Sequence, residues 1–280
     1  MIYVYDLGWM CNNILQYGHG YAFAREHGLQ ATSLRFCYKF RYFEISRDRR
    51  HNFARYLWAK YGSKLGVIPI VRYDIDIEKD PEAQHKEAFI ASGKTVVVKG
   101  WHFRCYDLFL KYRSEITSIF AFKRNINRKV DKYLSANESG TPPTQILRLG
   151  LHIRRGNYAQ WQGGKYYFDD TVYINKIREY ALLHPDRELH VYLCGNDRNI
   201  SREAYRQAVG TVSKLHFMNG NPGEDLCLLS RCDAIIGPPS TFSLVAAMYQ
   251  DRPLYWIQDP KKQLRRADFK YFEYLFRHII

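Results

Sequence analysis

The sequence predicts an α/β fold of two lobes, each built on a parallel sheet. Short apolar runs such as IYVY (2–5) and TVVVK (95–99) alternate with segments whose apolar residues recur every three or four positions, as in strands followed by helices. One stretch, 139–143 (SGTPP), has the glycine and prolines of a linker. We therefore predict an N-terminal lobe at 1–140 and a C-terminal Rossmann-like lobe at 141–260.

In the N-terminal lobe the first predicted strand, 2–5, leads directly into a helix that begins at Asn13 and stops at Gly28. Gly18 and Gly20 inside this helix each cost about 1 kcal/mol against alanine, so we expect close backbone packing there. The remaining elements are strand-like 31–36, helical 51–61, mixed 62–94, strand 95–99 and helix 106–120. We assign no helix or strand to the basic stretch 123–140.

The C-terminal lobe repeats strand and helix regularly, with helices of about ten residues between the strands. The predicted strands are 146–153, 189–194, 215–218, 233–237 and 254–257; the predicted helices are 171–184, 200–209, 224–231 and 241–249. The terminal stretch 261–280 predicts an amphipathic helix with basic and aromatic faces. We expect it to pack back on the N-terminal lobe, and contact with an anionic membrane surface is the alternative.

Composition limits the class of protein but does not identify its binding partner. No run of about 18 apolar residues is present, and the N-terminus lacks a basic region followed by an apolar core, so we expect an intracellular, cytoplasmic protein. Six cysteines form no CxxC or CxxH pair, which argues against a zinc site. The net charge of +14 suits nucleic acid, an anionic membrane surface or anionic substrates such as nucleotide sugars.

Two segments carry candidate oxyanion sites. The strand 146–153 ends in Arg154-Arg155-Gly156-Asn157, and a guanidinium matches a phosphate or carboxylate bidentately. Solvated arginines at a strand end are the plainer interpretation. Ser240 and Thr241 stand where a strand meets a helix, whose free amides can hold a phosphate, although helix capping alone explains these residues equally well. Because both segments follow strands of one parallel sheet, together they favour a diphosphate ligand.

These segments resemble motifs of the α-1,2-fucosyltransferases, a family (glycosyltransferase family 11) within the superfamily that includes the α-1,6- and protein O-fucosyltransferases. His152-Ile153-Arg154-Arg155-Gly156-Asn157-Tyr158 resembles the family's HxRRGDY motif. Further matches follow in chain order: Asn12-Asn13-Ile14-Leu15-Gln16-Tyr17 with GNQMFQY, the segment from Gly100-Trp101 to Phe109 with G-Y-F-Q-S, Glu224-Asp225-Leu226 with an acidic-Leu pair, Ser230-Arg231-Cys232-Asp233 with S-x-C-D, and Ser240-Thr241-Phe242-Ser243 with STFS. The resemblance spans about 8–257.

The resemblance implies a GT-B-like fold with the donor site in the C-terminal lobe, and a metal-independent, inverting transfer of fucose from GDP-fucose to a glycan hydroxyl. It implies that Arg154 and His152 are the catalytic residues: Arg154 holds the donor's β-phosphate, with Arg155 as a second arginine, and His152 orients their loop. The other implied donor-binding residues are Asn157, Asp197, Ser240, Thr241 and Phe242, and the implied acceptor-side residues are Asn12, Asn13 and Gln16. No metal or other cofactor and no nucleic acid is expected; peripheral contact with an anionic inner-membrane surface stays open.

The chain departs from the family pattern at three places. Asn157 replaces the family's aspartate, Trp9-Met10-Cys11 stands where glycines are usual, and Leu244 and Val245 replace two tryptophans. The last two departures point to a divergent acceptor side, so an α-1,6 linkage or another nucleotide sugar stays an alternative to α-1,2 transfer to galactose. A non-catalytic glycan- or nucleic-acid-binding protein is the alternative of another class.

An inverting displacement also needs a group that accepts the proton of the acceptor hydroxyl. Asp6, Asp169 and Asp170 are the candidates, and their spacing favours none of them.

Overall fold

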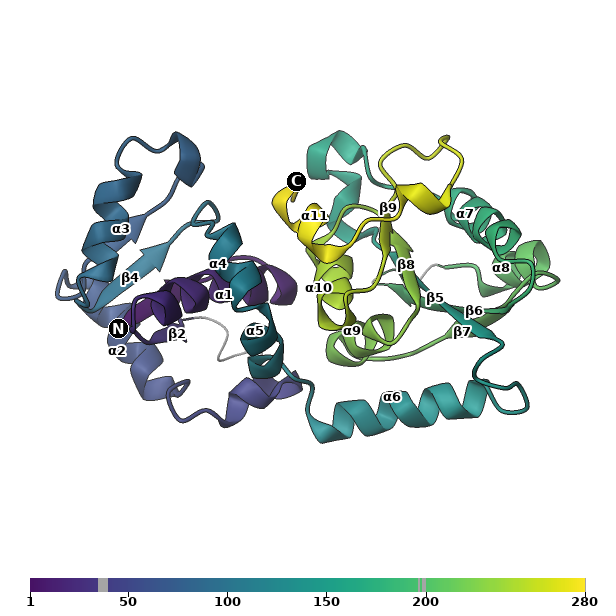
Figure 1. Ribbon diagram of the computed structural model, residues 1–280, viewed down its shortest axis with the longest axis horizontal. Coiled ribbons are helices and arrows are strands. Elements are labelled where there is room, and N and C mark those ends of the chain that lie inside the picture. The colour runs from purple at the N-terminus through teal and green to yellow at the C-terminus, as the bar shows by residue number, and fades with distance from the viewer. Residues whose placement is uncertain (35–39, 196, 198–199, 280) are drawn as a thin grey trace. The chain divides into compact units, whose positions relative to one another are not determined.

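The computed structural model describes residues 1–34, 40–195, 197 and 200–279, and it divides into two compact units, Met1–Lys123 and Arg124–Ile280 (Figure 1). Each unit is built on its own parallel sheet with helices packed against it. The predicted α/β fold of two parallel-sheet lobes is confirmed.

Unit 1 contains a four-stranded parallel sheet in the order β2-β1-β4-β3, formed by β1 (Ile2–Tyr5), β2 (Ala31–Ser33), β3 (Ile70–Arg72) and β4 (Val96–Lys99). Its helices are α1 (Met10–Glu26), α2 (Phe53–Lys64), α3 (Ala83–Ala91), α4 (Tyr106–Lys111) and α5 (Arg113–Ile119). The strand predicted over 31–36 ends at Ser33 within the described residues, and positions 35 and 36 lie outside them. The helix predicted over 106–120 is two helices, because Tyr112 (φ −101°, ψ 14°) leaves the helical conformation.

The two glycines of α1 lie where the helix approaches its neighbours most closely. A Cβ atom on Gly18 would meet Phe109 of α4 at 2.2 Å, and one on Gly20 would meet Val4 of β1 at 2.3 Å. Since real Cβ contacts are never that short, α1 can pack against both elements only with glycine at these positions. The close packing expected there is confirmed.

Unit 2 has the strand order β7-β6-β5-β8-β9, all parallel, formed by β5 (Ile146–Ile153), β6 (Glu188–Gly195), β7 (Lys214–Phe217), β8 (Ala234–Gly237) and β9 (Leu254–Trp256). Its helices are α6 (Arg124–Asn137), α7 (Asp170–Leu183), α8 (Arg202–Val209), α9 (Pro222–Ser230), α10 (Thr241–Gln250) and α11 (Phe272–Arg277). The order reverses at β5, so β5 and β8 flank the point where ligands bind in doubly wound sheets, beyond the strands' carboxyl ends.

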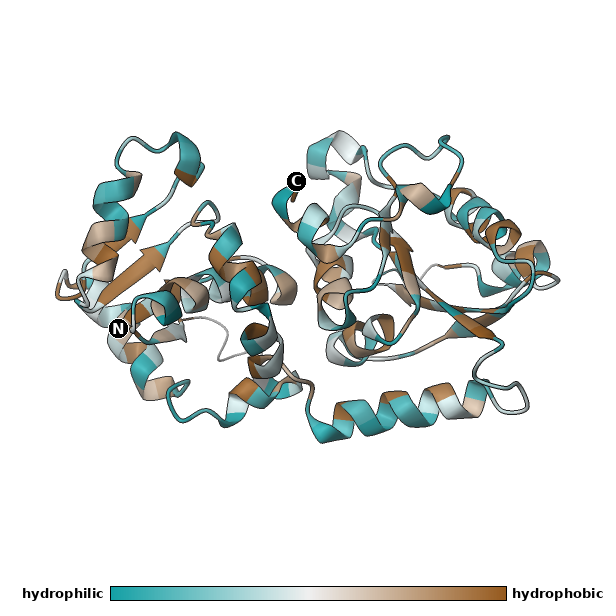
Figure 2. Cartoon of the chain, viewed as in Figure 1, coloured by the Kyte–Doolittle hydropathy of each residue, from teal (hydrophilic) through white to brown (hydrophobic). Residues whose placement is uncertain are grey.

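Helix α6 occupies the stretch to which the sequence assigned no element. Ile126, Val130 and Leu134 repeat every four residues and are buried, and the helix packs against α9. Figure 2 shows these hydrophobic turns as brown bands on a largely hydrophilic helix. Lys129 also pairs with Glu224 of α9 at 2.8 Å. The contacts of α6 therefore belong to unit 2 and divide the chain after Lys123, whereas the sequence placed the boundary in the 139–143 linker.

The prediction of a single helix over 261–280 is wrong, because most of this segment is not helical. The chain instead forms a 3₁₀ turn at Arg266–Asp268, a β-bridge between Leu254 and Lys270, and the six-residue helix α11. The turn is closed by Asp268, which pairs with Arg265 and with Lys262 and so holds the segment in a compact loop. The apolar side chains of α11 are buried and the helix packs against α10, within unit 2. Within the described ranges, no helix combines the length and apolar content needed to cross a bilayer.

Candidate functional site

The carboxyl ends of β5 and β8 approach each other closely because glycine flanks the end of β5 on both sides. A Cβ atom on Gly237 of β8 would lie 2.7 Å from the carbonyl oxygen of His152, and one on Gly195 of β6 would lie 2.6 Å from that of Ile153. No larger residue fits at either position without moving backbone. The loop after β5, starting at Arg154, and the loop from β8 to α10 therefore leave the sheet side by side.

Arg154 is partly exposed, and within the part of the chain that the structure describes its guanidinium contacts neutral groups. Its Nη2 donates to Oδ1 of Asn157 at 2.8 Å, and its guanidinium lies 5.5 Å from the ring centre of Tyr158. A neutral amide orients the guanidinium but does not neutralise it, as a carboxylate would. Arg154 is therefore held in place with its charge available to an anion.

Arg155 points into unit 2 instead. Its side chain is nearly buried, and it donates to the carbonyl oxygen of Phe168 at 2.9 Å, to Asp197 at 2.9 Å and to Asp170. Burial opposes the charge of Arg155, but the hydrogen bonds to the two carboxylates outweigh it and raise its pKa above the ordinary value. Arg155 and Asp197, both predicted to bind the donor, thus pair with each other in a network that ties the ends of β5 and β6 to α7.

His152, the seventh residue of β5, is 4% exposed and its ring stacks on Phe242 at 5.1 Å between ring centres. Burial, assisted by the charge of Arg154, lowers the pKa of His152 to about 3. Its Nδ1 is buried and has no hydrogen-bond partner. The imidazole is consequently neutral at physiological pH and positions Phe242 and the end of β5 rather than transferring protons.

The loop from β8 to α10 begins its helix with a side-chain cap. The Oγ of Ser240 accepts a hydrogen bond from the backbone N–H of Phe242 at 3.2 Å, and Ser240's carbonyl accepts one from Ser243 at 3.1 Å. The hydroxyl of Tyr158 donates to the carbonyl oxygen of Pro239 at 2.6 Å, which joins this loop to the one that follows β5. Arg154 and the positive N-terminal end of the α10 dipole thus flank one edge of the sheet.

Asp225, in the first turn of α9, was not among the predicted site residues. Its neighbour Glu224 completes a capping box with Asn221 and pairs with Lys129, whereas Oδ1 of Asp225 is buried and has no hydrogen-bond partner among the described residues. Burial and the adjacent charge of Glu224 raise the pKa of Asp225 to about 7. The Sγ of Cys194 on β6 contacts the backbone carbonyl oxygen of Asp225 at 3.9 Å, so the first turn of α9 lies beside the carboxyl end of β6. The spacing of Asn221 and Glu224 is that of a capping box, and this is the sequence signal that could have shown which member of the acidic pair the helix cap uses.

The residues predicted on the acceptor side lie in unit 1, at the loop from β1 to α1. Gln16 accepts from the backbone N–H of Leu7 at 3.1 Å and donates to the carbonyls of Leu7 and Asn12 at 2.7 and 3.0 Å. Its amide therefore holds the loop together. Asn13 is almost wholly buried, and Asn12 is partly exposed.

Each of the three candidate general bases takes part in interactions that support the fold. Asp6 is fully buried and accepts from Oγ of Ser33 at 2.7 Å. Asp169 caps α7 by accepting from the N–H of Val172 at 3.2 Å. Asp170 pairs with Arg155 and also accepts from the hydroxyl of Tyr205 at 3.2 Å. These contacts favour none of the three as the proton acceptor.

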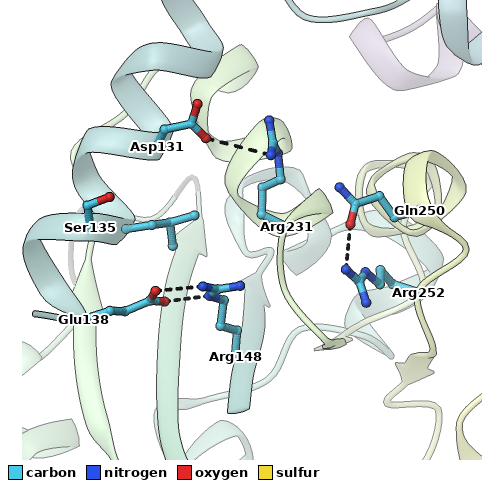
Figure 3. Close-up of a pocket in the computed structure, with 8 residues that line it drawn as sticks. Asp131, Ser135, Glu138, Arg148, Arg231, Gln250 and Arg252 are labelled. Carbon is cyan, nitrogen blue, oxygen red and sulfur yellow. Dashed lines mark hydrogen bonds and ion pairs between the residues drawn. The ribbon is translucent and has the colours of Figure 1, made fainter. Parts of the chain in front are cut away.

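A cavity of about 300 Å³ lies at the opposite, amino-terminal edge of the same sheet (Figure 3). Three arginines line it, and acidic or amide side chains of unit 2 engage each of them: Arg148 binds Glu138 at 2.6 and 2.7 Å, Arg231 binds Asn127 at 2.9 Å, and Arg252 binds Gln250 at 2.6 Å. This cavity is therefore an internally paired polar cluster, distinct from the edge that presents Arg154. Among the described residues, no three His, Cys, Asp or Glu side chains gather as metal ligands would.

Searches with the sequence found no matching family model and no match among curated proteins. Solved structures do resemble the fold. The chain is similar to an Arabidopsis thaliana FUT1 mutant in complex with GDP (12% identity, 96% of this chain and 73% of that chain covered, TM-score 0.64) and to POFUT1 in complex with GDP (11%, 91% and 97%, TM-score 0.56). It is also similar to a family 9 glycosyltransferase from Veillonella parvula (10%, 93% and 82%, TM-score 0.51).

The likeness extends over nine tenths or more of this chain in each case, so it includes both units. The chain therefore has the GT-B-like fold of these transferases, as expected. At 10–12% identity the likeness concerns the fold and carries no residue assignment.

Proposed function

We propose that this chain is a metal-independent, inverting fucosyltransferase that transfers fucose from GDP-fucose to a glycan hydroxyl. The observation that carries the proposal is the placement of Arg154 and the N-terminus of α10 at the carboxyl ends of the adjacent strands β5 and β8, where the sheet order reverses. The fold shared with transferases solved in complex with GDP supports the proposal.

The proposed transfer of fucose requires positive charge beside the diphosphate of the donor. As the acceptor oxygen attacks the anomeric carbon and the bond to the β-phosphate breaks, negative charge develops on the departing GDP. Preorganised donors that face this charge stabilise the transition state more than the ground state. In the proposal, Arg154 donates to the β-phosphate, and the α10 N-terminus at Ser240 and Thr241 holds the other oxygens. These protein cations and dipoles take the part that a divalent metal plays in other transferases.

The proposal assigns the guanine base to Asp225. Guanine presents two adjacent N–H donors on one edge, and the buried, unpartnered Oδ1 of Asp225 is an acceptor that lacks a donor. Uracil and cytosine lack that pair of donors, so this carboxylate selects GDP over UDP and CDP. Arg155 and Asp197 serve as the support of the site rather than as direct ligands, since they bind each other.

The linkage and the acceptor are supported by the motif resemblance alone. Transfer to the 2-hydroxyl of galactose is the reaction implied by the motif of Arg154, while the chain's own residues at Trp9-Met10-Cys11 depart from the family on the acceptor side. We therefore propose α-1,2 transfer as the first reaction to assay, with α-1,6 transfer as the comparison.

Calorimetric titration of GDP, UDP and CDP into wild type and Arg154→Ala tests the donor site. We expect selective GDP binding, and a loss of more than about 2 kcal/mol in Arg154→Ala because a charge-assisted contact disappears. Arg206→Ala, which removes an exposed arginine of α8, is the matched control and should bind as wild type does. Equal GDP affinity in Arg154→Ala and wild type would remove the role of Arg154.

Release of GDP from GDP-fucose, with and without oligosaccharide acceptors, separates an enzyme from a binding protein. The assay should give the same rate in EDTA as in added manganese. A rate that EDTA abolishes and manganese restores contradicts metal independence, and GDP binding with no turnover under any condition supports the binding-protein alternative.

A further inference from the structure

Helix α2 of unit 1 buries two small residues and exposes several large apolar ones. Ala59 and Gly62 are its buried residues, and a Cβ atom on Gly62 would meet Ile68 at 2.8 Å. The exposed large side chains of the helix and the turn after it are Phe53 (60% exposed), Trp58 (57%), Tyr61 (51%), Leu65 (78%) and Val67 (64%). We call these five residues the α2 apolar face.

The spacing of this face is helical. Trp58, Tyr61 and Leu65 follow one another at three and four residues, so they project from one side of the helix and its end. Scattered single apolar side chains are normal on a protein surface, but contiguous large ones mark a place where another surface binds.

The charges around this face have one sign. From Arg49 to Tyr73 the sequence contains six Lys or Arg and no Asp or Glu. Two of the cations lie directly at the face: Nζ of Lys60 is 5.6 Å and Nζ of Lys64 is 5.9 Å from the ring centre of Tyr61. The α2 apolar face is thus flanked by ammonium groups, and the chain segment that carries it contributes no carboxylate.

The combination of exposed apolar side chains and flanking cations favours one kind of binding partner over the others. A second copy of the chain would bring the same cations opposite each other, which repel in a symmetric interface. An anionic bilayer accepts both features, because Trp, Tyr and Leu enter the boundary between headgroups and acyl chains while Lys and Arg bind lipid phosphates. We propose that α2 and the turn at 65–67 dock the protein on the surface of an anionic membrane.

The docking surface differs from the segment that the sequence suggested for membrane contact. In 261–280, Phe272 and Phe276 are fully buried and Leu275 is nearly so, and the large side chains that stay exposed are two tyrosines, Tyr271 and Tyr274. On α2 the large apolar side chains are the exposed ones. The inference does not depend on the proposed transferase activity, since it concerns only how unit 1 meets a lipid surface.

Co-sedimentation of the full chain with vesicles tests the proposal. Vesicles of phosphatidylcholine mixed with phosphatidylglycerol should bind the protein, and vesicles of pure phosphatidylcholine should bind it at least about tenfold more weakly. The double variant Trp58→Ser/Leu65→Ser and the double variant Lys60→Glu/Lys64→Glu should each lose about tenfold or more of the partition coefficient on anionic vesicles.

Matched controls keep the result specific. Leu182→Ser/Val212→Ser removes two exposed apolar side chains from unit 2, and Lys132→Glu reverses an exposed charge on α6. Both should partition as wild type does. The substituted residues are exposed, apart from Lys60, which is partly exposed. Thermal melting of each variant tests whether it folds.

Fluorescence gives a second readout with the fold intact. Brominated lipids should quench the tryptophan emission of the wild type, and Trp58→Phe should lose most of this quenching while it keeps the apolar face. Unchanged partition of both α2 double variants overturns the proposal, as does equal binding to neutral and anionic vesicles. Sedimentation velocity that shows a dimer converted to monomer by Trp58→Ser/Leu65→Ser also overturns it, in favour of self-association.

Discussion

Replacing Asp225 by asparagine should make the protein more stable and a poorer GDP binder at the same time. The carboxyl of Asp225 has its pKa raised from 3.8 to about 7 by burial and by Glu224. Because the folded state then binds its proton more tightly than the unfolded state, the unfolding free energy falls as pH rises from about 4 to 7. Ionised Asp225 therefore costs stability at pH 8, and asparagine removes that cost.

The size of the effect follows from the shift. A displacement of three units corresponds to an upper limit of about 4 kcal/mol at 1.36 kcal/mol per unit. The residue is partly exposed, so we expect Asp225→Asn to gain about 2 kcal/mol at pH 8 and nothing below pH 4. If only the ionised carboxylate accepts the guanine donors, wild-type affinity for GDP should also be about tenfold lower at pH 6 than at pH 8.

Denaturant titrations and calorimetry at pH 5, 6.5 and 8 measure both effects. Asp225→Asn should bind GDP weakly with no pH dependence in this range. Asp186→Asn, at an exposed turn between α7 and β6, is the matched control and should change neither quantity. A loss of stability at pH 8 in Asp225→Asn refutes the buried-charge reasoning, and wild-type GDP affinity in the same variant refutes the guanine role.

Two further predictions concern the residues beside Arg154. Arg155→Ala should lower the unfolding free energy by about 3–5 kcal/mol, because Asp170 and Asp197 lose their buried partner; thermal melting measures it, and a change under 1 kcal/mol would mean that the network is not structural. His152 must take up a proton on unfolding below pH 6.5, so it should account for about 2 kcal/mol of the stability lost between pH 8 and pH 5. His152→Phe, which keeps a ring against Phe242, should lose that much less over the same range, and an unchanged pH dependence would contradict a neutral buried imidazole.

The strands and the switch-point site of unit 2 were predictable because their signals are local. β5 is a mostly apolar run of the predicted length, Arg154 directly follows it, and Ser240 comes three residues after the end of β8. Helix α6 was missed although Ile126, Val130 and Leu134 carry the correct spacing, because three apolar residues among so many charges form a weak stripe.

Roles that depend on tertiary partners could not be predicted. Arg154 and Arg155 are neighbours of the same type, yet one is partly exposed and the other is taken by carboxylates from α7 and from the end of β6. A sequence shows the presence of such side chains, while their direction is decided by residues 15 to 42 positions away.

Helix α6 also affects the order in which unit 2 can fold during synthesis, because it is made before the helix against which it packs. Its partners are late in the chain, since Asn127 binds Arg231 across 104 residues. At about 5–20 residues per second, the ribosome needs several seconds to deliver α9 after α6 has emerged. During that interval the stripe of Ile126, Val130 and Leu134 has no partner, so the nascent chain presents it to chaperones before unit 2 can close over it.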